Sequence, residues 1–339
     1  MIVSALSAVY GAVATWRRRW YTRTDRQHHL SQPVISIGNL RVGGSGKTPV
    51  VACVARLLLE HGERPAVLSR GYARREKTPG VTVVSDLTAV RADVAHAGDE
   101  PFLLARMLPG VPVLVCANRY DAGREAETRF GATVHVLDDG FQHVRLARDI
   151  DLLLVDEGDL ADRVLPAGRL REPLTNAVSA HAVIAPVAAR ASAKSIADRL
   201  GIAQAFTMTR ELGAPTLLSG AAPSPGAPVF AVAGIARPER FFDDLRASGS
   251  HVVGTMTFPD HHAFDSADLA AIVRTASEKG AAAVVTTEKD AVKMTAPGQS
   301  TLPFLAVPLT TRIEPAAAFS AWLLAQLARA REARSVSRS

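Results

Sequence analysis

The chain has 339 residues, of which 47% are hydrophobic and 21% charged, a composition typical of a folded globular protein. At about 150 residues per domain, this length predicts two domains. No apolar run reaches the roughly 18 residues of a membrane-spanning helix, which excludes a polytopic membrane protein. Two cysteines, Cys53 and Cys116, are too few for a disulfide framework, so we expect reduced thiols in the cytoplasm.

The net charge of +6 resides at the two ends of the chain. Residues 1–30 contain five arginines and one acidic residue, and residues 329–339 contain four arginines and one acidic residue. The residues between these ends are therefore close to neutral. A basic protein suggests a nucleic-acid partner, but basicity confined to the ends makes nucleic acid the least favoured one.

The first 16 residues are almost all apolar or small, and an arginine-rich stretch follows them. At about 100° per residue, one arc of a helix gathers Ile2, Val3, Leu6, Val9, Tyr10, Val13, Trp16 and Trp20, and the opposite arc gathers Ser4, Ser7, Gly11, Thr15, Arg18 and Arg19. A secretory signal would place its positive charges before the apolar run. We expect residues 1–24 to form an amphipathic helix on a membrane, with tryptophans at headgroup depth and arginines on anionic lipid. The alternative is a terminal helix packed on the core or on another subunit.

From residue 33 onward, short apolar runs alternate with stretches of helical pattern. Strands are expected at residues 34–37, 66–69, 111–116, 133–137, 151–155 and 182–185, and helices at 47–61, 99–108 and 119–130. Apolar strands that alternate with helices predict an α/β fold with a parallel sheet covered on both faces, as in P-loop NTPases.

A segment rich in Pro, Gly, Ser and Ala, residues 213–227, is typical of a linker. Beyond it, strands are expected at 229–232, 251–256, 283–286 and 304–307, and helices at 237–248, 265–279 and 314–331. The predicted organisation is an N-terminal helix (1–24), a core domain (25–212), the linker (213–227), a smaller α/β domain (228–331) and a basic tail (332–339).

The first expected strand leads into a glycine-rich segment that closes with Gly46-Lys47-Thr48, the end of a Walker A pattern. In such a loop, backbone N–H groups cradle phosphate oxygens, the lysine neutralises the β- and γ-phosphates, and the threonine hydroxyl ligates Mg²⁺. The pattern departs at Arg41, where a glycine is usual, and Gly43 and Gly44 are expected to supply the flexibility. The predicted nucleotide-binding residues are Arg41, Val42, Gly43, Gly44, Ser45, Gly46, Lys47 and Thr48.

A matching metal site requires an aspartate at the end of a later apolar strand. Asp138 and Asp139 follow such a run, and either is expected to bind Mg²⁺ together with Thr48, directly or through water. The alternative is an ordinary turn, because Asp-Gly is common at strand ends.

Two other P-loop classes fit poorly. A GTPase requires Asn-Lys-x-Asp, and residues 118–121 carry arginine at the second position. A partition-type ATPase carries lysine before the double glycine, where Val42 stands. A membrane-recruited switch or partition ATPase, which would phosphorylate no acceptor, is the alternative function.

Five further motifs narrow the choice when taken together with Gly38-Asn39. They are Gly98-Asp99-Glu100-Pro101 and the segments at 137–143, 165–173, 258–264 and 286–290. With these motifs the sequence resembles the tetraacyldisaccharide 4′-kinases, the lipid A 4′-kinases of Gram-negative bacteria, from the N-terminal helix to about residue 325. The resemblance implies phosphorylation of the 4′-hydroxyl of a tetraacylated glucosamine disaccharide 1-phosphate, with ATP and Mg²⁺, to form lipid IVA. It also implies a protein on the cytoplasmic face of the inner membrane, with the lipid A precursor and anionic lipid as partners, and we expect a monomer.

The resemblance assigns roles to individual residues. Asp99 matches the catalytic base, which would accept the proton of a sugar hydroxyl, and His261 matches its partner. Lys47 is expected to stabilise the transition state. The alternatives are a helix N-cap for Asp99 and a metal site for His261 with its neighbours. Near the nucleotide or the substrate phosphate, the matching positions are Arg119, Gln142, Arg169 and Arg171, whose alternative is surface ion pairing, and Glu172 would position either Mg²⁺ or an arginine.

Overall fold

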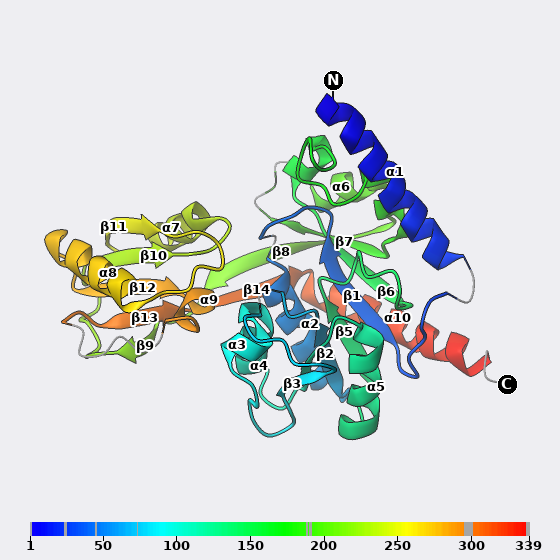
Figure 1. Ribbon diagram of the computed structural model, residues 1–339, viewed down its shortest axis with the longest axis horizontal. Helices are drawn as coiled ribbons and strands as arrows, with labels where there is room; N and C mark the ends of the chain where they lie inside the picture. The colour runs from blue at the N-terminus through cyan, green and yellow to red at the C-terminus, as the bar shows by residue number, and fades with distance from the viewer. Residues whose placement is uncertain are drawn as a thin grey trace.

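Two sheets organise the chain, and each forms its own layered unit (Figure 1). The computed structural model describes residues 2–23, 26–44, 46–72, 74–187, 189, 192–294 and 301–336. Over these residues, the larger sheet has nine strands, in the order β14 (Leu309–Glu314), β8 (Gln204–Leu212), β7 (Ala182–Pro186), β6 (Ile150–Leu154), β1 (Val34–Asn39), β5 (Val134–Asp138), β2 (Pro65–Ser69), β4 (Val113–Val115) and β3 (Thr82–Ser85). Its two edge strands, β14 and β3, run antiparallel to their neighbours, and the inner strands are parallel.

The larger sheet is covered on both faces, as its fully buried inner strands require. One face packs against α2 (Lys47–Glu60), α4 (Asp99–Met107) and α10 (Ala316–Val336). The other face packs against α5 (Arg119–Phe130) and α6 (Ala193–Leu200). Three short elements complete this unit: α3 (Val94–Ala97), η1 (Glu157–Ala161) and η2 (Leu174–Ser179).

The smaller sheet repeats this arrangement with five strands. Their order is β11 (Val252–Thr257), β10 (Val229–Ala233), β12 (Ala283–Thr287), β13 (Phe304–Val307) and an antiparallel β9 (Thr216–Ser219). Helix α7 (Pro238–Ala247) packs on one face and α8 (Ser266–Glu278) on the other, while α9 (Glu288–Ala291) follows β12 directly. The predicted fold class, a helix-covered parallel sheet with a second, smaller α/β unit, is confirmed.

The course of the chain corrects two predicted boundaries. Residues 216–219, inside the expected linker, form β9 and pair with β13 of the smaller sheet. After β13 the chain returns to the larger sheet as β14, and α10 buries Phe319 and Leu323 in the larger core. The predicted domain 228–331 therefore ends before β14. Apolar spacing indicated the final helix but could not indicate which sheet it would cover.

Helix α1 (Ile2–Thr22) lies along the outside of the larger unit (Figure 1). Its buried residues are Ser7, Gly11 and Arg18, from the predicted polar arc. The large residues of the apolar arc are all exposed: Ile2, Val3, Leu6, Val9, Tyr10, Val13, Trp16 and Trp20. The helix therefore docks through its small and polar side, and its apolar arc does not pack on the core of its own chain. Among the described helices, none is long and apolar enough to cross a membrane.

Candidate active site

The site forms where two adjacent parallel strands of the larger sheet end. Strands β1 and β5 pair in register, so their carboxyl ends meet at one edge. Strand β1 ends at Asn39, and Asp138 is the last residue of β5, with Asp139 directly after it. Lys47 Nζ lies 3.4 Å from Asp139 Oδ1 and donates to Asn39 Oδ1 over 3.2 Å. The fold thus brings the lysine of the glycine-rich loop to the predicted metal carboxylates.

The glycine-rich loop leads into the first turn of α2, which carries Lys47 and Thr48. Gly43 has a φ of 95°, and Gly46, which is the N-cap of α2, has a φ of 78°. Both values lie in a region that favours glycine. The Arg41 side chain is buried and donates to Asp159 over 3.2 Å, so it braces the loop from within. Val42, Gly43 and Gly44 are exposed, and the predicted contact Ser45 lies outside the described residues.

Asp138 is a buried carboxylate with incomplete hydrogen bonding. Its Oδ2 accepts a hydrogen bond from Ser69 Oγ over 3.1 Å, and its Oδ1 has no hydrogen-bond partner. Burial, the Glu100 carboxylate and the Asp139 carboxylate together raise the pKa of Asp138 well above its usual range. A cation beside Asp138 would give its Oδ1 a partner and would favour the ionised carboxylate, which lowers the pKa.

Asp139 is held in a fixed and ionised state. Its φ of 52° makes it one of two non-glycine residues with positive φ in the described chain. Arg171 donates to both of its carboxylate oxygens, over 2.7 and 2.8 Å. Although burial acts to raise the pKa of Asp139, the Arg171 hydrogen bonds and the Lys47 charge lower it overall. The strained backbone and the bidentate contact orient this carboxylate toward the loop lysine.

These side chains fit Mg²⁺ bound together with a nucleotide. The described residues contain no group of three or more His, Cys, Asp or Glu side chains that could hold a metal ion by itself. Mg²⁺ needs no such group, because one or two carboxylates with phosphate oxygens and water complete its octahedron. Asp138 and Asp139 would supply the carboxylates, and Thr48 its hydroxyl.

A carboxylate–imidazole pair, Asp99 and His261, spans the two units. Asp99 is the first residue of α4, whose N-cap is Gly98, so Asp99 is not the N-cap that the alternative proposed. Its Oδ2 lies 3.0 Å from Nδ1 of His261, which follows β11 in the smaller unit. His261 is the second non-glycine residue with positive φ, at 62°. The neighbouring His262 bonds Asp268 instead, over 2.7 Å, which contradicts a metal cluster at 260–262.

Two lysines lie beside this pair: Lys289, from the motif at 286–290 but with no role assigned from the sequence, and Lys293, which no motif indicated. Lys293 Nζ lies 3.7 Å from Asp99 Oδ2 and 2.9 Å from Asp290 Oδ1, in a buried position. Lys289 Nζ lies 3.3 Å from both Glu100 and Asp260. Burial acts to raise the pKa of Asp99, but the His261 hydrogen bond and the Lys293 charge lower it overall. Asp99 is therefore ionised at neutral pH and able to accept a proton.

Three of the four predicted substrate contacts converge on this edge. Arg171 also donates to the Asn39 carbonyl over 3.1 Å, and Gln142 donates to the same carbonyl over 3.0 Å. Arg119 is buried beside the two aspartates, and burial together with the Arg70 charge lowers its pKa to about 10. Its Nε has no hydrogen-bond partner, which suits an anionic ligand. Arg169, by contrast, is exposed and donates to Asp162 over 3.1 Å.

The smaller unit also approaches the glycine-rich loop. A Cβ atom built on Gly44 would lie 3.1 Å from the Cβ of Ala236, which follows β10. Beside this contact, Asp156 of the larger unit accepts from Arg237 over 3.1 Å and from Arg240 over 3.0 Å. The candidate site is therefore bounded by both units.

Comparison with known proteins assigns the chain to a family. The family described as LpxK, tetraacyldisaccharide-1-P 4′-kinase, matches residues 1–328. The chain belongs to the LpxK family. Among curated relatives, the tetraacyldisaccharide 4′-kinase of Syntrophus aciditrophicus is 37% identical over 94% of this chain and 91% of its own length, and that of Pelobacter propionicus is 42% identical over 85% and 81%.

A solved structure supports the same family. The crystal structure of the "apo" form of LpxK from Aquifex aeolicus in complex with ATP matches with a TM-score of 0.75 and 31% identity, over 96% of this chain and 100% of that one. The resemblance inferred from the motifs is thereby confirmed, and the chain is a kinase of the LpxK family.

The buried lysine gives a prediction for the pH dependence of this kinase. The Lys293 charge stabilises the Asp99 carboxylate, so Lys293→Met raises the pKa of Asp99. If Asp99 is the catalytic base, activity is then lost at a higher pH as the pH falls, and we expect the acid limb of kcat/KM to move up by about one unit. The measurement is kcat/KM against pH, with Lys194→Met as a control that removes an exposed ion pair. An unmoved acid limb in Lys293→Met would contradict this account.

Proposed function

We propose that the chain transfers the γ-phosphate of ATP to the 4′-hydroxyl of a tetraacylated glucosamine disaccharide 1-phosphate, and so forms the lipid A precursor lipid IVA. The observation that carries the proposal is the buried, ionised Asp99 held by His261, next to Glu100, whose charge acts on Asp138. The ATP in the Aquifex aeolicus structure supports ATP as the phosphate donor, and the names of the relatives support a tetraacylated disaccharide as the acceptor.

Asp99 would serve as the general base. Its Oδ2 is engaged by His261, which leaves Oδ1 to accept the proton of the sugar hydroxyl. As that proton leaves, the hydroxyl oxygen bonds to the γ-phosphorus, the bond to the bridging oxygen breaks, and ADP departs. His261 orients the carboxylate, and Lys293 keeps it ionised before the transfer.

The phosphate groups would be held by the glycine-rich loop and its neighbours. Backbone N–H groups of the glycine-rich loop and the Lys47 ammonium would face the phosphates, and Arg119 and Arg171 would add positive charge beside the transition state. Thr48, Asp138 and Asp139 would hold Mg²⁺, which neutralises phosphate charge when bound. The contact of both units around the site would exclude water, and this limits wasteful ATP hydrolysis.

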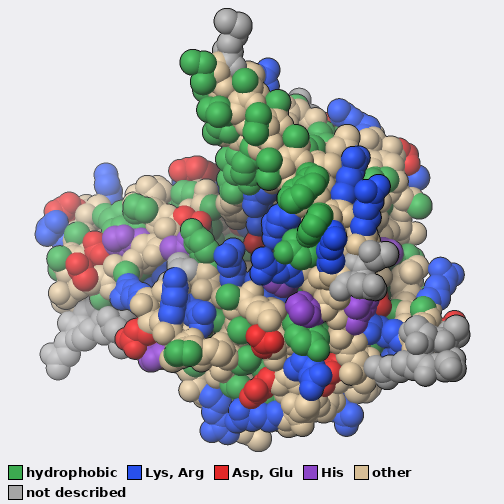
Figure 2. Space-filling view, turned by 45° about the vertical axis from the view of Figure 1, so that its right-hand side comes forward, with side chains coloured by type: hydrophobic (Ala, Val, Ile, Leu, Met, Phe, Trp, Pro, Cys, Tyr) green, Lys and Arg blue, Asp and Glu red, His purple; other side chains and the backbone are tan. Residues whose placement is uncertain are grey.

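Helix α1 would place the enzyme on the cytoplasmic face of the inner membrane. Its apolar arc is exposed: the solvent-exposed fraction is 61% for Trp16 and 42% for Trp20. Figure 2 shows hydrophobic side chains over the protruding end of the molecule and Lys and Arg side chains below them. The Arg26 guanidinium lies 3.4 Å from the centre of the Trp20 ring. Apolar side chains bordered by tryptophan and arginine suit an interface rich in anionic lipid.

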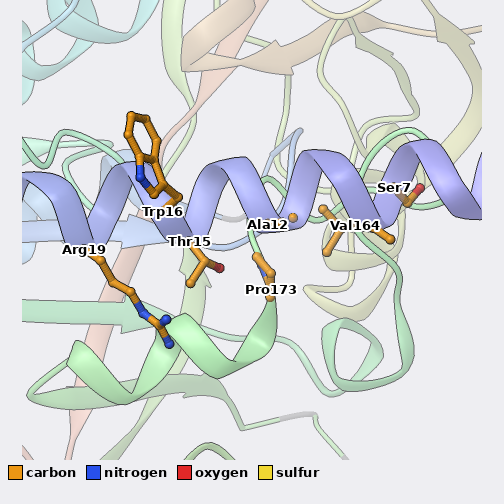
Figure 3. Close-up of a pocket in the computed structure, with 9 residues that line it drawn as sticks. Ser7, Ala12, Thr15, Trp16, Arg19, Val164 and Pro173 are labelled. Carbon is orange, nitrogen blue, oxygen red and sulfur yellow. The ribbon is translucent and has the colours of Figure 1, made fainter.

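A hollow beside α1 offers room for part of the lipid substrate. It measures about 430 Å³ and is lined mainly by small and apolar residues of α1, together with Val164 and Pro173. Figure 3 shows Thr15, Arg19 and Pro173 on one side of the helix and the Trp16 ring on the other. Because this hollow borders the exposed apolar arc, an acyl chain could remain near the bilayer while the sugar reaches Asp99.

Acceptor-dependent transfer tests the proposed reaction. With radiolabelled ATP and the lipid disaccharide in mixed micelles, the wild-type chain should label the acceptor. Asp99→Asn should lower kcat by about 10²- to 10⁴-fold, because the base is lost, and leave ATP affinity within about twofold. Asp243→Asn, which changes an exposed aspartate, is the control. Near-normal turnover of Asp99→Asn would refute the base assignment, and ATP hydrolysis without acceptor labelling would favour the switch ATPase.

The membrane assignment is tested on the surface of α1. Trp16→Glu should lower binding to vesicles that contain anionic phospholipid by roughly tenfold, because it puts a charge in the apolar arc. Leu87→Glu, at a residue of the larger unit that is 50% exposed, should leave binding unchanged. Cosedimentation with vesicles measures both. Equal binding by wild type and Trp16→Glu would mean that another surface anchors the protein.

A further inference from the structure

Arg18 differs from every other arginine at the start of the chain. It is 7% exposed, whereas its neighbours Arg17 and Arg19 are exposed. Contact with lipid alone does not explain a buried guanidinium, because burying a charge is costly unless the charge is paired. The contacts of Arg18 therefore indicate what this part of α1 does.

Every nitrogen of the Arg18 guanidinium has a partner on the larger unit. Nε and Nη2 donate to the two carboxylate oxygens of Glu172, each over 2.9 Å. Nη2 also donates to the Phe141 carbonyl over 2.8 Å, and Nη1 donates to Ser179 Oγ over 3.1 Å. The guanidinium also lies 4.1 Å from the centre of the Phe141 ring. A bidentate pair with these further contacts fixes both partners in direction as well as distance.

Glu172 passes this constraint to the active site. Its Oε1 also accepts from Gln142 Nε2 over 2.7 Å, and Gln142 in turn donates to the Asn39 carbonyl over 3.0 Å. Asn39 is the residue whose side chain accepts from Lys47. Three consecutive contacts, through Glu172 and Gln142, therefore connect Arg18 to Asn39, the residue that holds the phosphate-loop lysine.

The peptide chain provides a second connection. Glu172 directly follows Arg171, which bonds both carboxylate oxygens of Asp139. Phe141, which Arg18 contacts through its carbonyl and its ring, lies two residues beyond Asp139. Arg18 thus fixes two segments of the chain. Residues 139–142 carry Asp139, and residues 171–172 carry the arginine that binds Asp139.

We propose that Arg18 is a positioning residue for the phosphate transfer, so that turnover depends on the docking of α1 against the larger unit. The inference rests on the kinase reaction proposed above. Arg18 acts through Glu172: it holds Gln142 and Arg171 where they orient Asn39 and Asp139. The same helix that meets the membrane would thereby complete the catalytic geometry.

The test compares Arg18→Met with Arg334→Met in mixed micelles. Arg334 of α10 also forms a bidentate pair with a carboxylate, Asp149, over 3.1 and 2.6 Å. That carboxylate bonds the N–H of Val34, at the opposite end of β1 from Asn39. We expect Arg18→Met to lower kcat by tenfold or more, with KM for ATP and vesicle binding within twofold of wild type. Arg334→Met should keep kcat within twofold, even where it lowers Tm as much.

Two further variants separate positioning from folding. Arg18→Lys keeps the charge but not the fork, so we expect it to restore part of the lost kcat. If Arg18 acts through Glu172, adding Arg18→Met to Glu172→Gln should cost less than a further twofold. A normal kcat in Arg18→Met, or an equal loss in Arg334→Met, would overturn the inference while the reaction itself stands. A wild-type chain that labels no acceptor would overturn both.

Discussion

The structure depends on the concentration of negative charge around one edge of the larger sheet. Four carboxylates gather there: Asp99, Glu100, Asp138 and Asp139. Like charges this close are unfavourable unless cations compensate them. The compensation comes from separate parts of the chain, through Lys47 of the phosphate loop, Arg171 of a later loop, and Lys289 and Lys293 of the smaller unit. Asp138 remains the least compensated, which is why its neighbourhood suits Mg²⁺ with a nucleotide.

Local patterns were sufficient to predict the centre of this site. The strand, the glycine-rich loop and the helix at Lys47 are contiguous, and Asp138 stands where an apolar strand must end. Lys293 could not be found in this way, because its partner Asp99 lies far away in the sequence and belongs to the other unit. Likewise, the return of β14 to the larger sheet depends on pairing with β8, a half-buried strand whose alternating polar residues gave only a weak pattern.

Helix α1 likewise combines a feature that the sequence predicts with one that it does not. Its two arcs followed from the periodicity, but the arginine that docks did not, because Arg18 and Arg19 lie on the same polar arc and the sequence does not distinguish them. Glu172 decides among them by offering a buried carboxylate to Arg18 alone. The apolar arc is left outward, so under the proposals above one side of the helix would contact the membrane and the opposite side would brace the candidate site.

A double-mutant cycle between Asp99 and His261 tests most directly whether the two units form a single active site. Each substitution to asparagine, and the pair together, would be compared in kcat for acceptor phosphorylation. Residues that act as one unit are strongly non-additive. If Asp99 and His261 act as one unit, the double variant should be about as slow as Asp99→Asn alone. Losses that multiply would mean that the two residues act independently, and would contradict a base held across the units.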